Sequence, residues 1–136
     1  MRVAYQVTSP WEVPSDAFPL KEMGPKPTTA AEIDSWLRKW QQAHTHNHLN
    51  SSNPYYEGYR TRPESIISRS INGHRALSWT AEFKRNGGDW TELETMVFGE
   101  TAYAVVWLQV PTASRDTVGR EFEQLVASVR FSPPQH

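Results

Sequence analysis

The histidines at positions 44, 46 and 48 form the one cluster in this sequence whose spacing suits a metal site. Three imidazoles can hold a catalytic zinc ion, which takes three protein ligands and a water molecule. On a helix His44 and His48 would share a face, and in an extended chain His46 would join them. No carboxylate accompanies them at a recognised offset, and histidines near a helix end also interact favourably with its dipole. A metal-binding or metal-dependent hydrolytic protein is therefore the alternative hypothesis.

Aromatic side chains suggest a second kind of site, a surface that binds a protein segment or a small apolar ligand. The candidates lie in a polar stretch and on an expected strand, and they are Tyr55, Tyr56, Tyr59, Tyr103 and Trp107. A tyrosine gains by laying its ring on a neighbouring surface while its hydroxyl stays hydrated. If the face that carries Tyr103 and Trp107 is partly uncovered, it forms an apolar patch. Filling of the core is the other explanation for these two residues.

Other catalytic arrangements are not indicated. Glu92 and Glu94 fall on one face of an expected strand, and we expect both carboxylates to point into solvent. Ser128 has no base at a recognisable offset, so it is not a nucleophile. The sequence contains no phosphate-binding loop and no other cofactor motif. The leading hypothesis is therefore a non-catalytic binding or adaptor module whose partner is an unknown protein or small ligand.

Composition excludes several broad classes. The chain has 136 residues, 14 Lys and Arg against 15 Asp and Glu, a net charge of −1 and no cysteine. The balanced charge gives no footprint for nucleic acid, and the lack of cysteine excludes disulfides and thiolate metal ligands. No apolar run approaches the length of about 18 residues that suggests a membrane span. The first residues do not form a signal peptide, so we expect a cytoplasmic protein, although an exported protein without its leader would look the same.

The elements that must position these residues fit one domain, residues 1–136. Thr29 and Glu32 have the spacing of a capping box, and Ile33, Trp36 and Trp40 follow on one helical stripe. The connector after this helix has no regular period, so we expect a loop that its tyrosines anchor, with a mobile tip over 46–52. The expected order is a proline-rich lead (1–28), a helix (29–43), a polar connector (44–63), a meander of strands (64–111) and a C-terminal helix (114–130).

The meander has clear turn signals. Asn72-Gly73 and Asn86-Gly87 supply the left-handed backbone that tight hairpins need, and Gly99-Glu100 suits another. The stretch 101–110 is apolar on both faces, which predicts a central strand that is covered on both sides. A free sheet edge at Val3–Val7 or Ser65–Ile71 would allow a homodimer.

The segment from Ile71 to Phe131 resembles the Mog1/PsbP-like superfamily, which includes the bacterial DcrB and DUF1795 proteins. The matching positions are Gly73 and Ala76 at a strand entry, and Ser128 and Phe131 after the last helix. The resemblance implies an α+β fold, a single antiparallel sheet flanked by helices as an α/β/α sandwich. Members are mostly non-enzymatic proteins that dock on other proteins, and no binding residue transfers by motif. A cystatin-like or helix-grip fold is the alternative.

Overall fold

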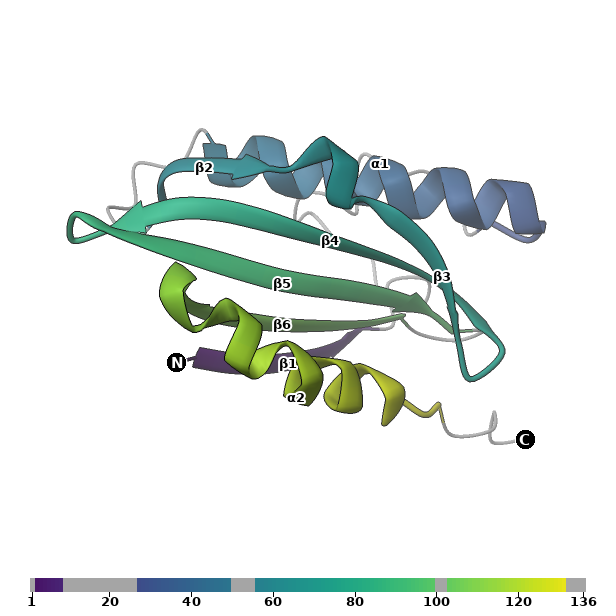
Figure 1. The fold of residues 1–136 in the computed structure, drawn as a ribbon. Coiled ribbons are helices and arrows are strands. Elements are labelled where there is room, and N and C mark those ends of the chain that lie inside the picture. Colours follow the sequence, from purple (N-terminus) through teal and green to yellow (C-terminus); the bar gives the residue numbers. More distant parts are fainter. Residues whose placement is uncertain (1, 9–26, 50–55, 100–102, 132–136) are drawn as a thin grey trace.

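The computed structural model describes residues 2–8, 27–49, 56–99 and 103–131. One antiparallel sheet lies between two helices, with α1 (Ala30–Leu49) on one face and α2 (Arg115–Ala127) on the other (Figure 1). The predicted α+β class, a single antiparallel sheet flanked by helices, is confirmed. Within the described part of the chain, neither helix has both the length and the apolar character that crossing a membrane requires.

The sheet has six strands, and all of their pairings are antiparallel. Its order is β1-β6-β5-β4, and the outer edge of β4 is shared by β2 and β3. The strands are β1 (Arg2–Thr8), β2 (Glu57–Thr61), β3 (Ile67–Ile71), β4 (His74–Arg85), β5 (Gly88–Phe98) and β6 (Tyr103–Pro111).

Strand β4 is long enough for two short strands to pair along it in succession. β3 pairs with 74–78 and β2 with 81–84, and a 3₁₀ turn at Pro63–Ser65 lies between them. Opposite that turn, the Thr80 carbonyl accepts a hydrogen bond from Arg62 N at 2.9 Å. The Thr80 amide donates to Ser65 Oγ at 2.9 Å. The backbone of β4 is therefore satisfied even where no strand lies beside it.

Two predicted turns join β3 to β4 and β4 to β5. Asn72 and Gly73 have φ of 52° and 83°, and Asn86 and Gly87 have φ of 52° and 79°. Positive φ at both central residues is the signature of the type I′ turn, whose twist matches that of paired strands. Both hairpins are confirmed, whereas the one expected at Gly99-Glu100 lies partly outside the described residues.

The start of α1 is predicted correctly and its end is not. Glu32 N donates to Thr29 Oγ1 at 3.2 Å, which is one half of a capping box, and Glu32 Oε2 accepts from Thr28 N, one residue before the cap, at 3.0 Å. The helix continues to Leu49 instead of ending at 43. The predicted connector over 44–63 is therefore wrong in two places. Residues 44–49 belong to α1, and residues 57–61 form β2. Residues 46–49 of the expected mobile tip belong to α1, and residues 50–52 lie outside the described residues.

Each helix packs its apolar stripe on one face of the sheet. Under α2 the core is aliphatic around Phe122, and Ala104, Val106 and Leu108 of β6 belong to it. Under α1 the core is aromatic, and Tyr103 and Val105 of β6 belong to it. Strand β6 is thus buried on both faces, as its composition predicts. α2 begins at Arg115, after a 3₁₀ turn at Thr112–Ser114, and no side chain caps it.

Candidate functional site

A cluster of titratable side chains lies buried between α1 and β5. His44 follows Trp40 by one helical turn, so it continues the stripe of α1 that faces the sheet. Its Nε2 lies 3.2 Å from Glu94 Oε2 and 3.7 Å from Glu92 Oε1. The two carboxylates are each 3% exposed and the imidazole is 18% exposed. Their ligand atoms lie within 4.8 Å of one another. We call His44, Glu92 and Glu94 the His–Glu–Glu cluster.

Polar side chains from other strands hold the Glu92 carboxylate in place. Tyr59 of β2 donates its hydroxyl to Oε1 at 2.8 Å, and Gln109 of β6 donates Nε2 to Oε2 at 2.7 Å. The amide of Gln109 is itself oriented, because its Oε1 accepts from Arg85 Nη2 at 3.0 Å. Its Nε2 also donates to the Tyr56 hydroxyl at 3.2 Å. Hydrogen bonds from β2 and from β6 therefore fix both oxygens of Glu92.

Burial and charge shift the pKa values of the cluster in different directions. Burial alone would lower the pKa of His44, but the charges of Glu94 and Glu92 raise it to about 10. Burial raises the pKa of Glu94 to about 8, although the His44 charge opposes this. Burial also disfavours charge on Glu92, yet hydrogen bonds from His44, Glu94 and Gln109 lower its pKa to about 2. The surroundings therefore favour the charged form of Glu92 and the neutral form of Glu94.

Aromatic rings enclose the imidazole. The Trp40 ring stacks on it at a centroid distance of 5.0 Å and an interplanar angle of 12°. Tyr59 and Trp79 meet its edge, each with a centroid distance of 6.3 Å. Tryptophan faces favour a neighbouring cation, so the stacking suits a charged imidazole as well as a neutral one.

The site predicted from the three histidines does not form. In a continuous helix, residues two apart point about 200° from each other. His44 therefore faces the sheet, whereas His46 is exposed to solvent. The side chain of His48 lies outside the described residues. Of the three predicted ligands, only His44 belongs to a cluster of possible ligands in the described part of the chain.

The expectation that Glu92 and Glu94 point into solvent is wrong, because both are buried. Their face of β5 is the one that also carries Met96 and Phe98, and α1 covers it. The sequence holds the signal, since residues at i, i+2 and i+4 of a strand share a face. Met96 and Phe98 in line with the two glutamates are compatible with a buried face, and the cover that α1 provides decides it. Likewise, the position of His44 four residues after Trp40 marks it as a residue that faces the sheet.

The five aromatic candidates do not form one surface. Tyr59 and Tyr103 are buried in the core, at 0% and 4% exposure. Trp107 is half-buried against the aromatic core under α1, and Tyr56 is half-buried against Tyr59 and Phe83. Tyr55 lies outside the described residues. The patch expected around Tyr103 is covered because α1 reaches across it.

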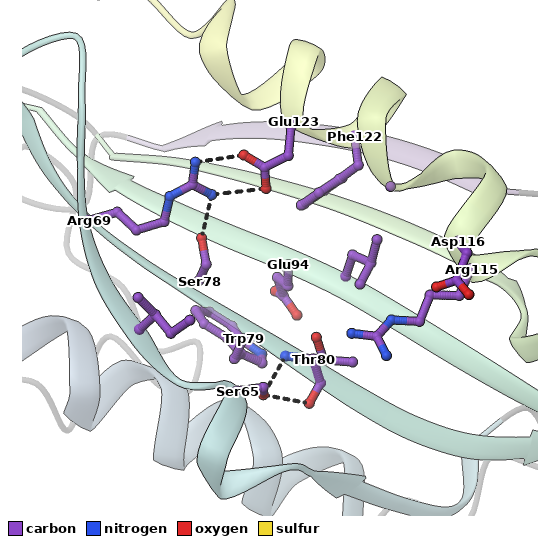
Figure 2. A pocket seen from close by; sticks show the side chains of 13 residues that line it. Ser65, Arg69, Ser78, Trp79, Thr80, Glu94, Arg115, Asp116, Phe122 and Glu123 are labelled. Atoms are coloured by element: carbon purple, nitrogen blue, oxygen red, sulfur yellow. Dashed lines mark hydrogen bonds and ion pairs between the residues drawn. The ribbon is translucent and has the colours of Figure 1, made fainter.

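The opposite face of the sheet carries an open groove beside α2 (Figure 2). Its volume is about 690 Å³, which is within the range of ligand-binding sites. β4 and β5 form its floor, while α2 and the segment from Ser65 to Arg69 form its walls. We call it the α2 groove. Its lining combines apolar side chains, two arginines and three acidic residues, which are Ile67, Leu93, Phe122, Arg69, Arg115, Glu94, Asp116 and Glu123.

An ion pair bridges one end of the α2 groove. Arg69 Nη2 lies 2.6 Å from Glu123 Oε2, and Arg69 Nη1 lies 3.1 Å from Glu123 Oε1. Arg69 also donates to Ser78 Oγ on the floor at 3.1 Å. At the other end Arg115, at the start of α2, points its guanidinium over the floor (Figure 2).

Comparisons with known proteins bear on the fold alone. No family model and no curated protein matches this chain. The chain is similar to a crystal structure of PA94 from Pseudomonas aeruginosa, a protein of unknown function, with 15% sequence identity and a TM-score of 0.52. The similarity covers 69% of this chain and 64% of the length of PA94. It supports the α+β architecture.

Proposed function

We propose that this chain is a non-catalytic binding module of the Mog1/PsbP-like type, and that it holds an extended protein segment in the α2 groove. The observation that carries the proposal is the exposure of Ile67 at the wall of this groove. Its side chain is 56% exposed, and no other large hydrophobic side chain in the described part of the chain is exposed. An isoleucine in water beside a concave surface gains free energy when a partner covers it.

The lining of the groove specifies the kind of segment that fits. Leu93 and Phe122 line the same groove as Ile67, and this combination suits apolar side chains of the partner. Arg115 at one end can pair bidentately with a carboxylate. Arg69 is already paired with Glu123, so it is less available for a second carboxylate. We infer a segment with an apolar residue followed by an acidic side chain or a free carboxyl terminus.

The aromatic surface predicted from the tyrosines and Trp107 supports this function less well. Tyr59 and Tyr103 are covered by the chain itself, and exposing them would cost the burial of large rings. The α2 groove needs no such rearrangement.

A peptide library tests the proposal. Peptides displayed on phage are selected on the full chain, and the affinities of the best ones are measured by fluorescence anisotropy. We expect apolar residues followed by an acid in the selected peptides. An Ile67→Ser substitution and an Arg115→Gln substitution should each weaken binding about tenfold, which corresponds to about 1.4 kcal/mol. Arg60→Gln, which removes an exposed arginine of β2 away from the groove, is the matched control and should leave the affinity unchanged.

Two results would contradict the proposal. One is equal binding of the selected peptides to wild type and to the Ile67→Ser/Arg115→Gln double variant. The other is a set of peptide-induced amide shifts that avoids β3 and α2. A homodimer is a separate prediction. β1 pairs with β6 at one end of the sheet order, and sedimentation at high concentration would show whether two copies pair there.

A further inference from the structure

We propose that the His–Glu–Glu cluster binds a divalent transition-metal ion, with His44 Nε2 and one oxygen each from Glu92 and Glu94 as ligands. This inference does not rest on the proposed function. α1 covers the cluster, whereas α2 and the segment from Ser65 to Arg69 wall the groove, and Glu94 is the cluster member that also lines the groove.

The distances within the cluster suit a shared ion. Nitrogen and carboxylate ligands lie about 2.0–2.2 Å from zinc, so two ligands of a tetrahedral ion are about 3.4 Å apart. His44 Nε2 lies 3.2 Å from Glu94 Oε2 and 3.7 Å from Glu92 Oε1. The three ligand atoms all lie within 4.8 Å of one another, so side-chain shifts of up to about 1 Å would let a small ion sit among them. The three ligands come from two elements, α1 and β5, that packing already holds together.

The charges and lone pairs of the cluster also suit a cation. An entering ion displaces the protons of His44 and Glu94, and the two carboxylates with a neutral imidazole then carry two negative charges that one divalent ion neutralises inside a low-dielectric core. Glu94 Oε2 is buried, and the neighbour that the structure gives it is His44 Nε2 at 3.2 Å. Because that nitrogen is itself a possible ligand, a metal ion between the two atoms would satisfy both.

The surroundings act as an outer layer of a metal site does. Ligating carboxylates are usually hydrogen-bonded by neighbouring groups, which fix their orientation. Tyr59 and Gln109 do this for the two oxygens of Glu92, and each oxygen keeps a second lone pair for an ion. Arg85 donates to Gln109 Oε1 and so orients the amide that supports Glu92.

The ligand types indicate which ions fit. One imidazole and two carboxylates, without any thiolate, suit Zn²⁺, Mn²⁺ or Fe²⁺. Calcium and magnesium prefer ligands that are all oxygen. The imidazole is 18% exposed, so this edge of the cluster gives an ion its route from solvent.

Calorimetric titration of the full chain with Zn²⁺ tests the site, using protein without an affinity tag after treatment with a chelator. We expect one ion per chain and a Kd of about 10 µM or lower. Glu94→Gln keeps the size of the side chain but removes its charge, and it should weaken binding at least tenfold. Tyr59→Phe removes one supporting hydrogen bond and should weaken binding by about tenfold. Circular dichroism verifies that each variant is folded.

A matched control separates the His–Glu–Glu cluster from the three-histidine hypothesis. The His46→Ala/His48→Ala double variant should bind Zn²⁺ within about twofold of wild type. A second measurement needs no variant, because Mn²⁺ broadens the NMR signals of nearby nuclei. We expect the broadening to centre on residues 92–94 of β5.

Three results would overturn the proposal. The first is a wild-type Kd weaker than about 100 µM. The second is unchanged binding in a folded Glu94→Gln variant. The third is broadening that centres on 46–48 and leaves β5 sharp. If the variants do not fold, the Mn²⁺ measurement on the wild-type chain decides alone.

Discussion

One helix covers each face of this sheet, but the side chains buried on the two faces differ in character. The face under α2 is aliphatic and closely packed around Phe122, and it leaves a groove open at one side. The face under α1 is aromatic and includes the His–Glu–Glu cluster. Strand β5 contributes to both, since Val97 points to the first face and Glu92 and Glu94 point to the second.

The difference shows that stability alone does not account for the face under α1. Apolar residues of similar volume in place of a buried ionic cluster are often neutral or stabilising, because taking charges out of water costs several kcal/mol per ion. The face under α2 demonstrates that this sheet can be covered by aliphatic side chains. A charged cluster within an otherwise apolar layer is typical of a functional site.

The largest expected effect comes from breaking the cluster at one member. We expect Glu92→Leu to lower the free energy of unfolding by about 3–5 kcal/mol, because the charge on His44 loses its carboxylate and Tyr59 and Gln109 lose their acceptor. Urea unfolding measures this. The matched control on the other face of β5 is Thr95→Val, which removes one hydroxyl bonded to Ser78 and should cost about 1 kcal/mol. Equal losses for the two variants would show that the faces do not differ in this way.

Replacing the whole cluster should have the opposite sign. In the triple variant His44→Leu/Glu92→Leu/Glu94→Met no charge is left buried without a partner. We expect its free energy of unfolding to lie between that of wild type and about 1–4 kcal/mol above it. A folded triple variant that is less stable than the Glu92→Leu single variant would indicate that the cluster exists to stabilise the fold.

The pH dependence of stability should come mainly from the face under α1. In the presence of a chelator, the raised pKa of Glu94 contributes stability below about 4.5 that is lost as pH rises through 8. The raised pKa of His44 contributes stability below about 6.5 that is lost as pH rises through 10. Each proton released on unfolding lowers the free energy of unfolding by about 1.4 kcal/mol per pH unit.

The steepest decline should therefore lie between pH 6.5 and 8, where both groups contribute. The lowered pKa of Glu92 has the opposite effect, because its contribution is lost as pH falls from about 4.5 through 2. Urea unfolding at several pH values checks both the decline in the free energy of unfolding at high pH and its decline at low pH. The triple apolar variant is the control, and an equally steep decline in that variant would assign the effect to other groups.

The smallest expected effect concerns the end of the α2 groove. A double-mutant cycle on Arg69→Ala and Glu123→Ala should give a coupling energy of at most about 1 kcal/mol, because Glu123 is 55% exposed and solvent screens the pair. The coupling should fall further as salt is added. A coupling above 2 kcal/mol, or one that salt leaves unchanged, would mean that this end of the groove is as protected from water as the His–Glu–Glu cluster.

Sequence patterns predicted those parts of the fold in which neighbouring residues decide the structure. Asn-Gly pairs choose a turn by their own backbone preferences, and the capping box starts α1 through residues three apart. The end of α1 was not predicted, because residues 44–48 are weak helix formers and packing of His44 against the sheet overrides that preference. Strand β2 was missed because it is short, contains Gly58 at a φ of 66° and pairs irregularly with β4.

The site was harder to predict than the fold because it depends on which face of a strand is covered. Alternation shows that Glu92 and Glu94 share a face, but a helix distant in sequence decides whether that face meets water. Tyr59 and Gln109 join the cluster only through sheet pairing, and no local spacing connects them to His44. The α2 groove likewise depends on where α2 lies across β5.

The shared edge of β4 has a consequence for how the chain avoids misassembly. An unpaired strand edge is a template on which other chains can add, which leads to aggregates during folding. Here β2, the 3₁₀ turn and β3 occupy the β4 edge in succession, and Ser65 and Arg62 complete it at Thr80. The outer edge that β2 and β3 then present is broken into two pieces of five residues each. A second chain meets no long straight edge there, and this disfavours edge-to-edge aggregation on this side of the sheet.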